Sequence, residues 1–142
     1  MKTKNILVLC TGNSCRSQIA EGWLKNYSGG NANIYSAGIE THGVNPKAVM
    51  IMKEAGIDIS GHTSNHINEY KEIEFDYIIT VCDHAKENCP YFPSHAIRLH
   101  QNFSDPAKAK GSEEEILNEF RRVREEIRMY SEKFVKENIK IQ

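Results

Sequence analysis

The sequence has no long hydrophobic run, because no apolar stretch approaches the roughly 20 residues that a helix needs to cross a bilayer. The first residues, Met1 to Asn5, are followed by an apolar run that is too short for a signal peptide. An excess of one charge is also missing, since 18 Lys and Arg residues are balanced by 19 Asp and Glu residues for a net charge of -1. These absences argue against membrane, secreted and nucleic-acid-binding proteins, and we expect a cytoplasmic protein.

Cysteines are few, and repeats, low-complexity segments and linkers are missing. The chain has 4 cysteines in 142 residues. Because the cytoplasm keeps thiols reduced, we interpret them as catalytic, redox-active or metal-binding rather than as a disulfide framework. A chain of this length can bury one core, so we expect a single domain over residues 1–142.

One stretch combines a buried strand, a tight loop and a helix start. It follows the apolar run Ile6 to Leu9 and precedes an amphipathic segment. Its residues are Cys10, Thr11, Gly12, Asn13, Ser14, Cys15, Arg16 and Ser17. Such a loop leaves backbone N–H groups unpaired beside the positive end of the helix dipole, while Gly12 permits a tight turn and Asn13 tolerates left-handed angles. We therefore predict that the backbone from Thr11 to Ser17 binds a tetrahedral oxyanion.

Two side chains give this loop its expected chemistry. Arg16 provides a planar guanidinium that matches two oxygens of an oxyanion. Donors that hold an anion also stabilise a thiolate, so we expect Cys10 to have a depressed pKa and to act as a nucleophile. The Ser17 hydroxyl is expected to donate to the same sulfur. A turn with a buried structural cysteine is the alternative interpretation.

The hydrophobic pattern predicts alternating strands and helices. Strands are expected at 4–9, 34–37, 75–81 and 96–100, and helices at 19–28, 45–55, 65–70 and 112–134, with a frayed tail after Phe134. Asn45 before Pro46, and Ser112 with Glu115, are typical helix starts. The alternation predicts an α/β fold with a central four-stranded parallel sheet, helices on both faces and Cys10 at the carboxyl edge, where ligands bind.

The loop from Cys10 to Ser17 resembles the signature loop of the low-molecular-weight protein tyrosine phosphatases, and the wider chain is similar to their redox relatives, the thioredoxin-coupled arsenate reductases. The resemblance also rests on Tyr35 to Ile39, Gly56 to Ser60, Val81-Cys82, Cys89-Pro90 and Asp105-Pro106-Ala107. It implies the phosphatase-like fold and Asp105 as the general acid for the leaving oxygen. It further implies arsenate as substrate, phosphate or sulfate as competing oxyanions, and no tightly bound cofactor, with reducing equivalents from thioredoxin.

Two further cysteines fit such a reductase. Cys82 follows a predicted strand that ends at the same sheet edge as Cys10. If Cys10 attacks arsenate, Cys82 can attack the Cys10 sulfur of the adduct, which releases arsenite and leaves a Cys10–Cys82 disulfide. Attack by Cys89 would then move the disulfide to Cys82–Cys89, where thioredoxin can reduce it. Phosphate cannot follow this route, because thiols do not reduce phosphorus(V). We expect a monomeric arsenate reductase.

Two other functions stay open. The first is a low-molecular-weight tyrosine phosphatase whose extra cysteines protect Cys10 from overoxidation. The second is a non-catalytic module that only binds anions or senses thiols. Tyrosine phosphatases commonly have a tyrosine after the Asp-Pro pair to hold an aromatic substrate, whereas this chain has Ala107. The substitution favours the reductase.

Individual residues also have alternative interpretations. Cys82, His84 and Cys89 could bind zinc, although their spacing matches no common zinc pattern. Cys89 could be an idle surface thiol, and Asp105 could belong to an ordinary Asp-Pro turn. Cys15 is better interpreted as a buried structural thiol than as a reactive one.

A metal site is suggested by the resemblance and opposed by one residue. Some reductases of this family bind potassium through oxygens that match Asn13, Glu21, Ser36 and a carboxylate at the position of Asn65. Since the Asn65 amide carries no charge, the set lacks one hard anionic ligand. We therefore expect no metal site.

Overall fold

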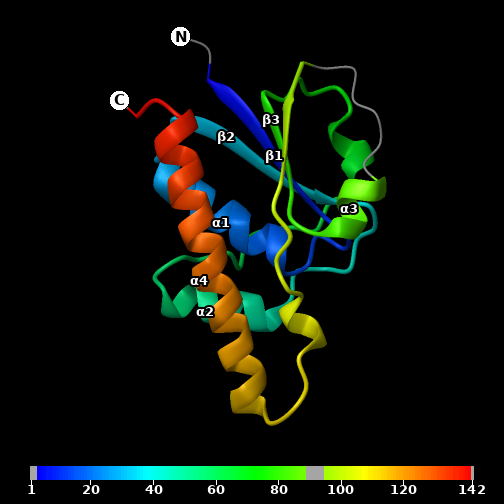
Figure 1. The fold of residues 1–142 in the computed structure, drawn as a ribbon, viewed down its shortest axis with the longest axis vertical. Helices are drawn as coiled ribbons and strands as arrows, with labels where there is room; N and C mark the ends of the chain where they lie inside the picture. The colour runs from blue at the N-terminus through cyan, green and yellow to red at the C-terminus, as the bar shows by residue number, and fades with distance from the viewer. Residues whose placement is uncertain (1–2, 89–94, 142) are drawn as a thin grey trace.

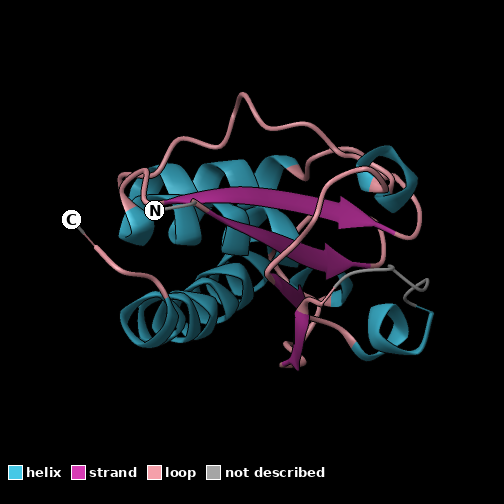
Figure 2. Cartoon of the chain, turned by 90° about the horizontal axis from the view of Figure 1, so that it is seen from above, coloured by secondary structure: helices cyan, strands magenta, loops and turns pink. Residues whose placement is uncertain are grey.

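The computed structural model describes residues 3–88 and 95–141, and the strands in these residues form one sheet. The strands are β1 (Lys4–Cys10), β2 (Ala32–Gly38), β3 (Tyr77–Thr80) and β4 (Ile97–His100). They are parallel and lie in the order β2-β1-β3-β4. The N- and C-termini lie together at the amino end of the strands (Figure 1, Figure 2). The carboxyl edge of the sheet is therefore left to the loops that follow the strands.

Helices flank the sheet on both sides, as predicted. The α-helices are α1 (Arg16–Ser28), α2 (Pro46–Glu54), α3 (Asp83–Asn88) and α4 (Glu113–Asn138), and short 3-10 turns form η1 (Ile67–Tyr70) and η2 (Pro106–Lys108). In Figure 1, α1, α2 and α4 gather on one side of the strands and α3 lies on the other. Among the described helices, none combines the length and the apolar character needed for a bilayer crossing. The α/β fold with a central four-stranded parallel sheet is confirmed.

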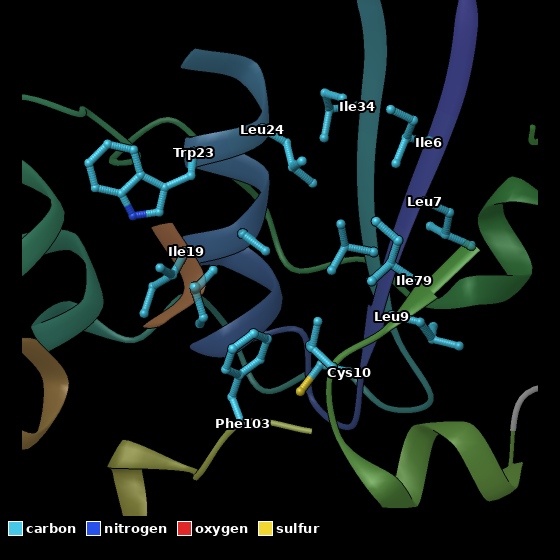
Figure 3. Close-up of a cluster of buried hydrophobic side chains, with 14 of the residues drawn as sticks. Ile6, Leu7, Leu9, Cys10, Ile19, Trp23, Leu24, Ile34, Ile79 and Phe103 are labelled. Atoms are coloured by element: carbon cyan, nitrogen blue, oxygen red, sulfur yellow. The ribbon is translucent and has the colours of Figure 1, made fainter. Parts of the chain in front are cut away.

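The core is built around β1, whose apolar side chains have no contact with solvent. Ile6 to Leu9 are each 0% exposed. In Figure 3, Ile6 lies on the side of β1 that faces Leu24 of α1, whereas Leu7 and Leu9 lie on the opposite side of the strand. A strand at the centre of a parallel sheet is covered on both faces, which explains its continuous apolar run. Cys10, the last residue of β1, is thus held at the buried end of this strand.

The helix-start signals are confirmed, and the prediction for the C-terminal tail is wrong. The Asn45 side chain accepts a hydrogen bond from the Lys47 amide at 2.8 Å, and Ser112 and Glu115 form a reciprocal capping box. The chain does not fray after Phe134, because α4 continues to Asn138. Val135 and Ile139 explain the difference, since both are buried apolar anchors within a segment that otherwise appears polar.

Candidate active site

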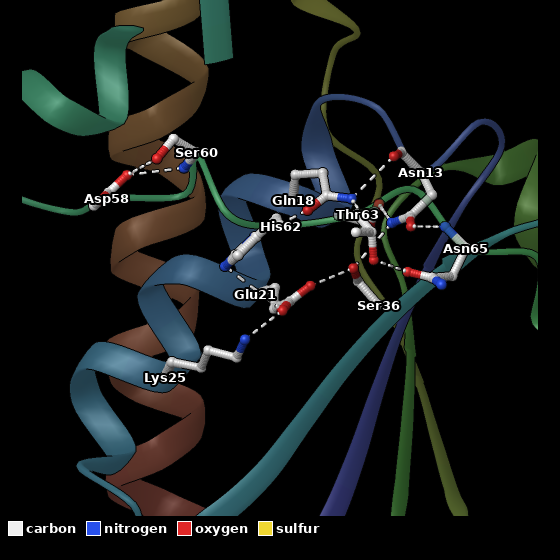
Figure 4. A network of polar contacts seen from close by, with 11 residues as sticks. Asn13, Gln18, Glu21, Lys25, Ser36, Asp58, Ser60, His62, Thr63 and Asn65 are labelled. Atoms are coloured by element: carbon white, nitrogen blue, oxygen red, sulfur yellow. Dashed lines mark hydrogen bonds and ion pairs between the residues drawn. The ribbon is translucent and has the colours of Figure 1, made fainter. Parts of the chain in front are cut away.

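The loop between β1 and α1 has the left-handed residue that the sequence indicated. Asn13 has a φ of 48° and is fully buried. Its Oδ1 accepts from the Asn65 amide at 2.7 Å, and its Nδ2 donates to Ser17 Oγ at 2.8 Å and to Ser36 Oγ at 3.0 Å (Figure 4). These bonds offset the cost of the left-handed backbone. The Ser17 hydroxyl thus lies against Asn13, where it shapes the loop, rather than at the Cys10 sulfur.

A second segment, residues 39–45, supports the loop from outside. Its amides donate to loop carbonyls: Ile39 N to Cys10 O at 3.3 Å, Glu40 N to Thr11 O at 2.9 Å, His42 N to Gly12 O at 2.9 Å and Asn45 N to Ser14 O at 3.1 Å. The loop carbonyls are therefore engaged by this segment. The loop amides are left to bind an anion, which is the arrangement that an oxyanion loop requires.

Gly38, at the end of β2, lies where this support is tightest. A Cβ atom at Gly38 would lie 2.4 Å from Glu40 O, 2.7 Å from Thr11 O and 2.8 Å from Asn13 N, all of them backbone atoms. Gly38→Ala should therefore displace the oxyanion loop, lower the free energy of unfolding by about 1–3 kcal/mol and weaken phosphate binding. Thermal denaturation and phosphate titration test this. Gly61→Ala is the matched control, because a Cβ at Gly61 meets nothing within 4 Å; equal effects of the two variants would contradict the prediction.

The loop forms one wall of a cavity of about 250 Å³. The lining residues of this wall are Cys10, Thr11, Gly12, Ser14, Cys15 and Arg16. The cavity is also lined by Asp105 and by three exposed residues, His42, Ala107 and Lys108, which we call the rim. Sequence reasoning missed His42 and Lys108, which come from distant segments and belong to no motif. The cavity is large enough to admit a small oxyanion.

Arg16 and Asp105 meet across this cavity. The Arg16 Nη1 donates to Phe103 O at 2.9 Å, and Nη2 lies 3.6 Å from Asp105 Oδ2. The other Asp105 oxygen, Oδ1, accepts from the Ala107 amide at 3.0 Å and so caps the turn η2. The Asp-Pro turn and a role in the cavity are thus compatible, because one carboxylate oxygen serves each.

Cys10 and Cys82 also lie close together, because each thiol shifts the pKa of the other and the hydroxyl of Thr11, the residue after Cys10, lies 3.2 Å from Cys82 Sγ. The interaction with the Cys10 thiol, together with hydrogen bonds from the Thr11 hydroxyl and the Ala85 amide, lowers the pKa of Cys82 to about 5 against the effect of burial. The same interaction between the two thiols, followed by burial, raises the pKa of Cys10 above its ordinary value, although the Arg16 guanidinium acts in the opposite direction. The predicted depression of the Cys10 pKa is therefore wrong in this arrangement, because a second thiol competes for the same proton.

This proton sharing predicts a distinctive titration. A group with a lowered pKa is deprotonated above that value, so reduced protein should gain one thiolate with a midpoint near pH 5, assigned to Cys82. Ultraviolet thiolate absorbance measures it. Cys82→Ser should remove this step, and Cys10→Ser should move its midpoint to higher pH, because the strongest stabilising donor is lost. Cys15 does not interfere, since burial raises its pKa to about 12. Persistence of the step in Cys82→Ser would contradict the assignment.

The remaining predicted thiol, Cys89, lies outside the described residues. The zinc alternative, which needs Cys89 together with Cys82 and His84, lies partly outside them too. Within residues 3–88 and 95–141, no group of three or more His, Cys, Asp or Glu side chains is arranged to hold a metal ion.

The residues suggested for potassium are close together but already bonded to one another. Glu21 Oε1 accepts from Ser36 Oγ at 2.5 Å, and Oε2 lies 2.5 Å from Lys25 Nζ (Figure 4). Asn13 turns its amide nitrogen toward Ser36, and Asn65 Oδ1 accepts from Thr63 at 2.7 Å. The Lys25 ammonium thus neutralises the one carboxylate of the set. These residues do not fit a potassium ion in this arrangement.

Comparison with known proteins agrees with the geometry. The family model described as low molecular weight phosphotyrosine protein phosphatase matches residues 5–142. The chain is 56% identical over 127 residues to the arsenate reductase of Halalkalibacterium halodurans, which covers 89% of this chain and 91% of that protein. It is similar to a solved arsenate reductase in a phosphate-binding state, with a TM-score of 0.78, 31% identity and coverage of 94% of this chain and 98% of the other.

An arsenate reductase solved in an oxidized state gives a TM-score of 0.81 at 30% identity, with the same 94% and 98% coverage. The match to the family model extends over nearly the whole chain, and it includes the loop, the strand end and the Asp-Pro turn described above. This chain therefore belongs to the low molecular weight phosphotyrosine protein phosphatase family.

Proposed function

We propose that this protein reduces arsenate to arsenite with three cysteines that act in turn. The observation that carries the proposal is the position of Cys82 beside the oxyanion loop, where its sulfur lies 3.2 Å from the hydroxyl of Thr11 and its thiol interacts with that of Cys10. Hydrolysis of a phosphate ester needs only one thiol, whereas reduction needs a second thiol within reach of the first. The arsenate reductase names of the relatives support the same reaction.

In the first step, the loop amides and Arg16 bind the oxygens of arsenate. Cys10 passes its proton to the neighbouring Cys82 while its sulfur attacks arsenic. A sulfur–arsenic bond forms and an arsenic–oxygen bond breaks. Asp105, which faces Arg16 in the cavity, donates a proton to the departing oxygen, which leaves as water.

In the second step, Cys82 attacks the Cys10 sulfur. The sulfur–arsenic bond breaks and its electron pair stays on arsenic, which is reduced from As(V) to As(III). The two thiols are oxidised to the Cys10–Cys82 disulfide, and the Cys82 proton goes to the departing arsenite. The Thr11 hydroxyl, 3.2 Å from Cys82 Sγ, and the Ala85 amide, 3.4 Å from the same sulfur, stabilise the attacking Cys82 thiolate.

In the third step, Cys89 attacks Cys82, frees Cys10 and moves the disulfide to Cys82–Cys89. Thioredoxin then supplies two electrons through its own dithiol, so the protein needs no tightly bound cofactor. We place this cycle in the cytoplasm, in a monomer, where thioredoxin is kept reduced.

A tyrosine phosphatase with protective cysteines is the second candidate, and the family supports it. The rim argues against it as the main activity. Ala107 lines the cavity and is exposed, so this position offers no aromatic wall for a phosphotyrosine ring. Weak hydrolysis of aryl phosphates is nevertheless expected, because Cys10, Arg16 and Asp105 suffice for it.

One assay separates these functions. Purified protein is mixed with arsenate, thioredoxin, thioredoxin reductase and NADPH, and NADPH oxidation is followed. Arsenate-dependent turnover supports the reductase. Hydrolysis of an aryl phosphate without such turnover supports the phosphatase, and oxyanion binding without either reaction supports a non-catalytic module.

A further inference from the structure

The rim carries a charge that the proposed steps do not use. Lys108 is the last residue of the turn η2, lines the cavity and is exposed. Its side chain has no ion pair and no hydrogen bond within the part of the chain that the structure describes. An ammonium group without a partner at the edge of an anion cavity is available to bind a ligand.

The turn that holds Lys108 also holds Asp105. The Ala107 amide donates to Asp105 Oδ1 at 3.0 Å, and the Lys108 amide donates to Asp105 O at 3.1 Å. Asp105 and Lys108 are therefore fixed relative to each other. When the Asp105 carboxylate faces a leaving oxygen, the side chain of Lys108 therefore lies on the same side of the cavity.

The other charges around the cavity are already balanced. Arg16 lies 3.6 Å from Asp105, so these two charges offset each other before a ligand binds. His42 Nε2 lies 2.6 Å from Glu40 Oε2 in an exposed pair. Lys108 is thus the lining residue whose charge is available in full to an incoming anion.

The position of Lys108 selects among oxyanions. A tetrahedral anion whose oxygens face the loop amides and Arg16 presents its remaining oxygen to Asp105 and the rim. In an inorganic anion, that oxygen is a hydroxyl or carries negative charge and can accept from an ammonium group. In an ester, it is a bridging oxygen that bears an organic group, and this group must occupy the rim.

We propose, building on the proposed function, that Lys108 is a specificity-determining residue that binds this outward oxygen and favours inorganic tetrahedral oxyanions over phosphate esters. The contact is exposed to solvent, so its contribution is modest and depends on salt. Lys108 thus complements Ala107: one residue attracts the small anion, and the other leaves no aromatic support for an ester.

Lys108→Met tests the proposal. Lys110→Met is the matched control, because Lys110 lies two residues further along the chain and is also exposed but does not line the cavity. Titration of the reduced protein with inorganic phosphate should show about fivefold weaker binding for Lys108→Met at low salt and less than twofold for Lys110→Met. Lys108→Arg should restore most of the affinity, and high salt should shrink the difference. In turnover, the KM for arsenate should rise more than the KM for an aryl phosphate, with little change in kcat.

Three results would overturn the proposal. They are unchanged phosphate affinity in Lys108→Met, an equal loss in Lys110→Met, and equal loss of affinity for phosphate and aryl phosphate. The phosphate titration does not require reduction of arsenate. A protein that binds phosphate through Lys108 but never reduces arsenate would therefore refute the proposed function and leave the role of Lys108 intact.

Discussion

Cys10→Ser should abolish both arsenate reduction and aryl-phosphate hydrolysis, with a loss of at least about a thousandfold in each. Both reactions begin with attack by the Cys10 sulfur, which lies at the end of β1 and is 3% exposed at the cavity wall. A serine hydroxyl is a far weaker nucleophile near neutral pH, and no step after the attack can proceed without the covalent adduct. The NADPH-coupled assay and release of an aryl alcohol measure the two rates.

Cys15→Ser is the matched control for this variant. Cys15 lines the same cavity and is also buried, but burial raises its pKa to about 12, so it stays protonated. We expect Cys15→Ser to keep most of the turnover, and Cys10→Ser to keep phosphate binding through the loop amides and Arg16. Appreciable turnover by Cys10→Ser on either substrate would exclude Cys10 as the nucleophile.

Local signals explain why much of the fold could be predicted from the sequence. The apolar run Ile6 to Leu9 has no polar interruption because β1 is covered on both faces. Asn45 and Ser112 cap their helices through bonds with residues only two or three positions away. The prediction for the tail after Phe134 was wrong because the tail is mostly polar and contains only two apolar anchors. Whether those two side chains become buried depends on where α4 packs.

The residues of the candidate site that belong to sequence motifs could be predicted from the sequence. Cys10, Arg16 and Asp105 come together because parallel strands end at one edge and the loops after them share it. The bond from Thr11 to Cys82 was not predictable, since it depends on the register that places Leu9 opposite Thr80.

The same register explains the error on the Cys10 pKa. Helix dipole and loop donors argue for a depressed value when Cys10 is considered alone. The Cys82 thiol, which follows β3, reverses the direction, and no local pattern in the sequence shows that it lies beside Cys10. The position of Lys108 at the cavity was not predictable for a related reason, because an exposed lysine in a turn has no distinguishing sequence signal.

Variants of the two resolving thiols, Cys82 and Cys89, should differ in how much arsenite they release. Cys82→Ser should stop arsenite release altogether, because Cys82 is the thiol that interacts with Cys10 among the described cysteines. Cys89→Ser should release one arsenite for each protein molecule and then stop. Both variants should keep hydrolysing aryl phosphates, which needs no second thiol. Arsenite released per protein, measured in a single turnover and then with thioredoxin present, gives the comparison.

The chemistry predicts which disulfide Cys89→Ser must trap. Cys82 directly precedes α3, a helix of 6 residues that separates it from Cys89 in the sequence. Positions seven apart on a straight helix are about 10.5 Å apart along the axis, whereas a disulfide requires Cα atoms within about 7 Å, so we expect α3 to unwind when Cys82 and Cys89 join. Without Cys89 that change has no disulfide to drive it, and the oxidised variant should retain α3 and a Cys10–Cys82 bond. Peptide mapping by mass spectrometry under non-reducing conditions identifies the bond. A different disulfide, or none, would show that Cys82 does not attack the Cys10 adduct, and the proposed order of steps would have to be abandoned.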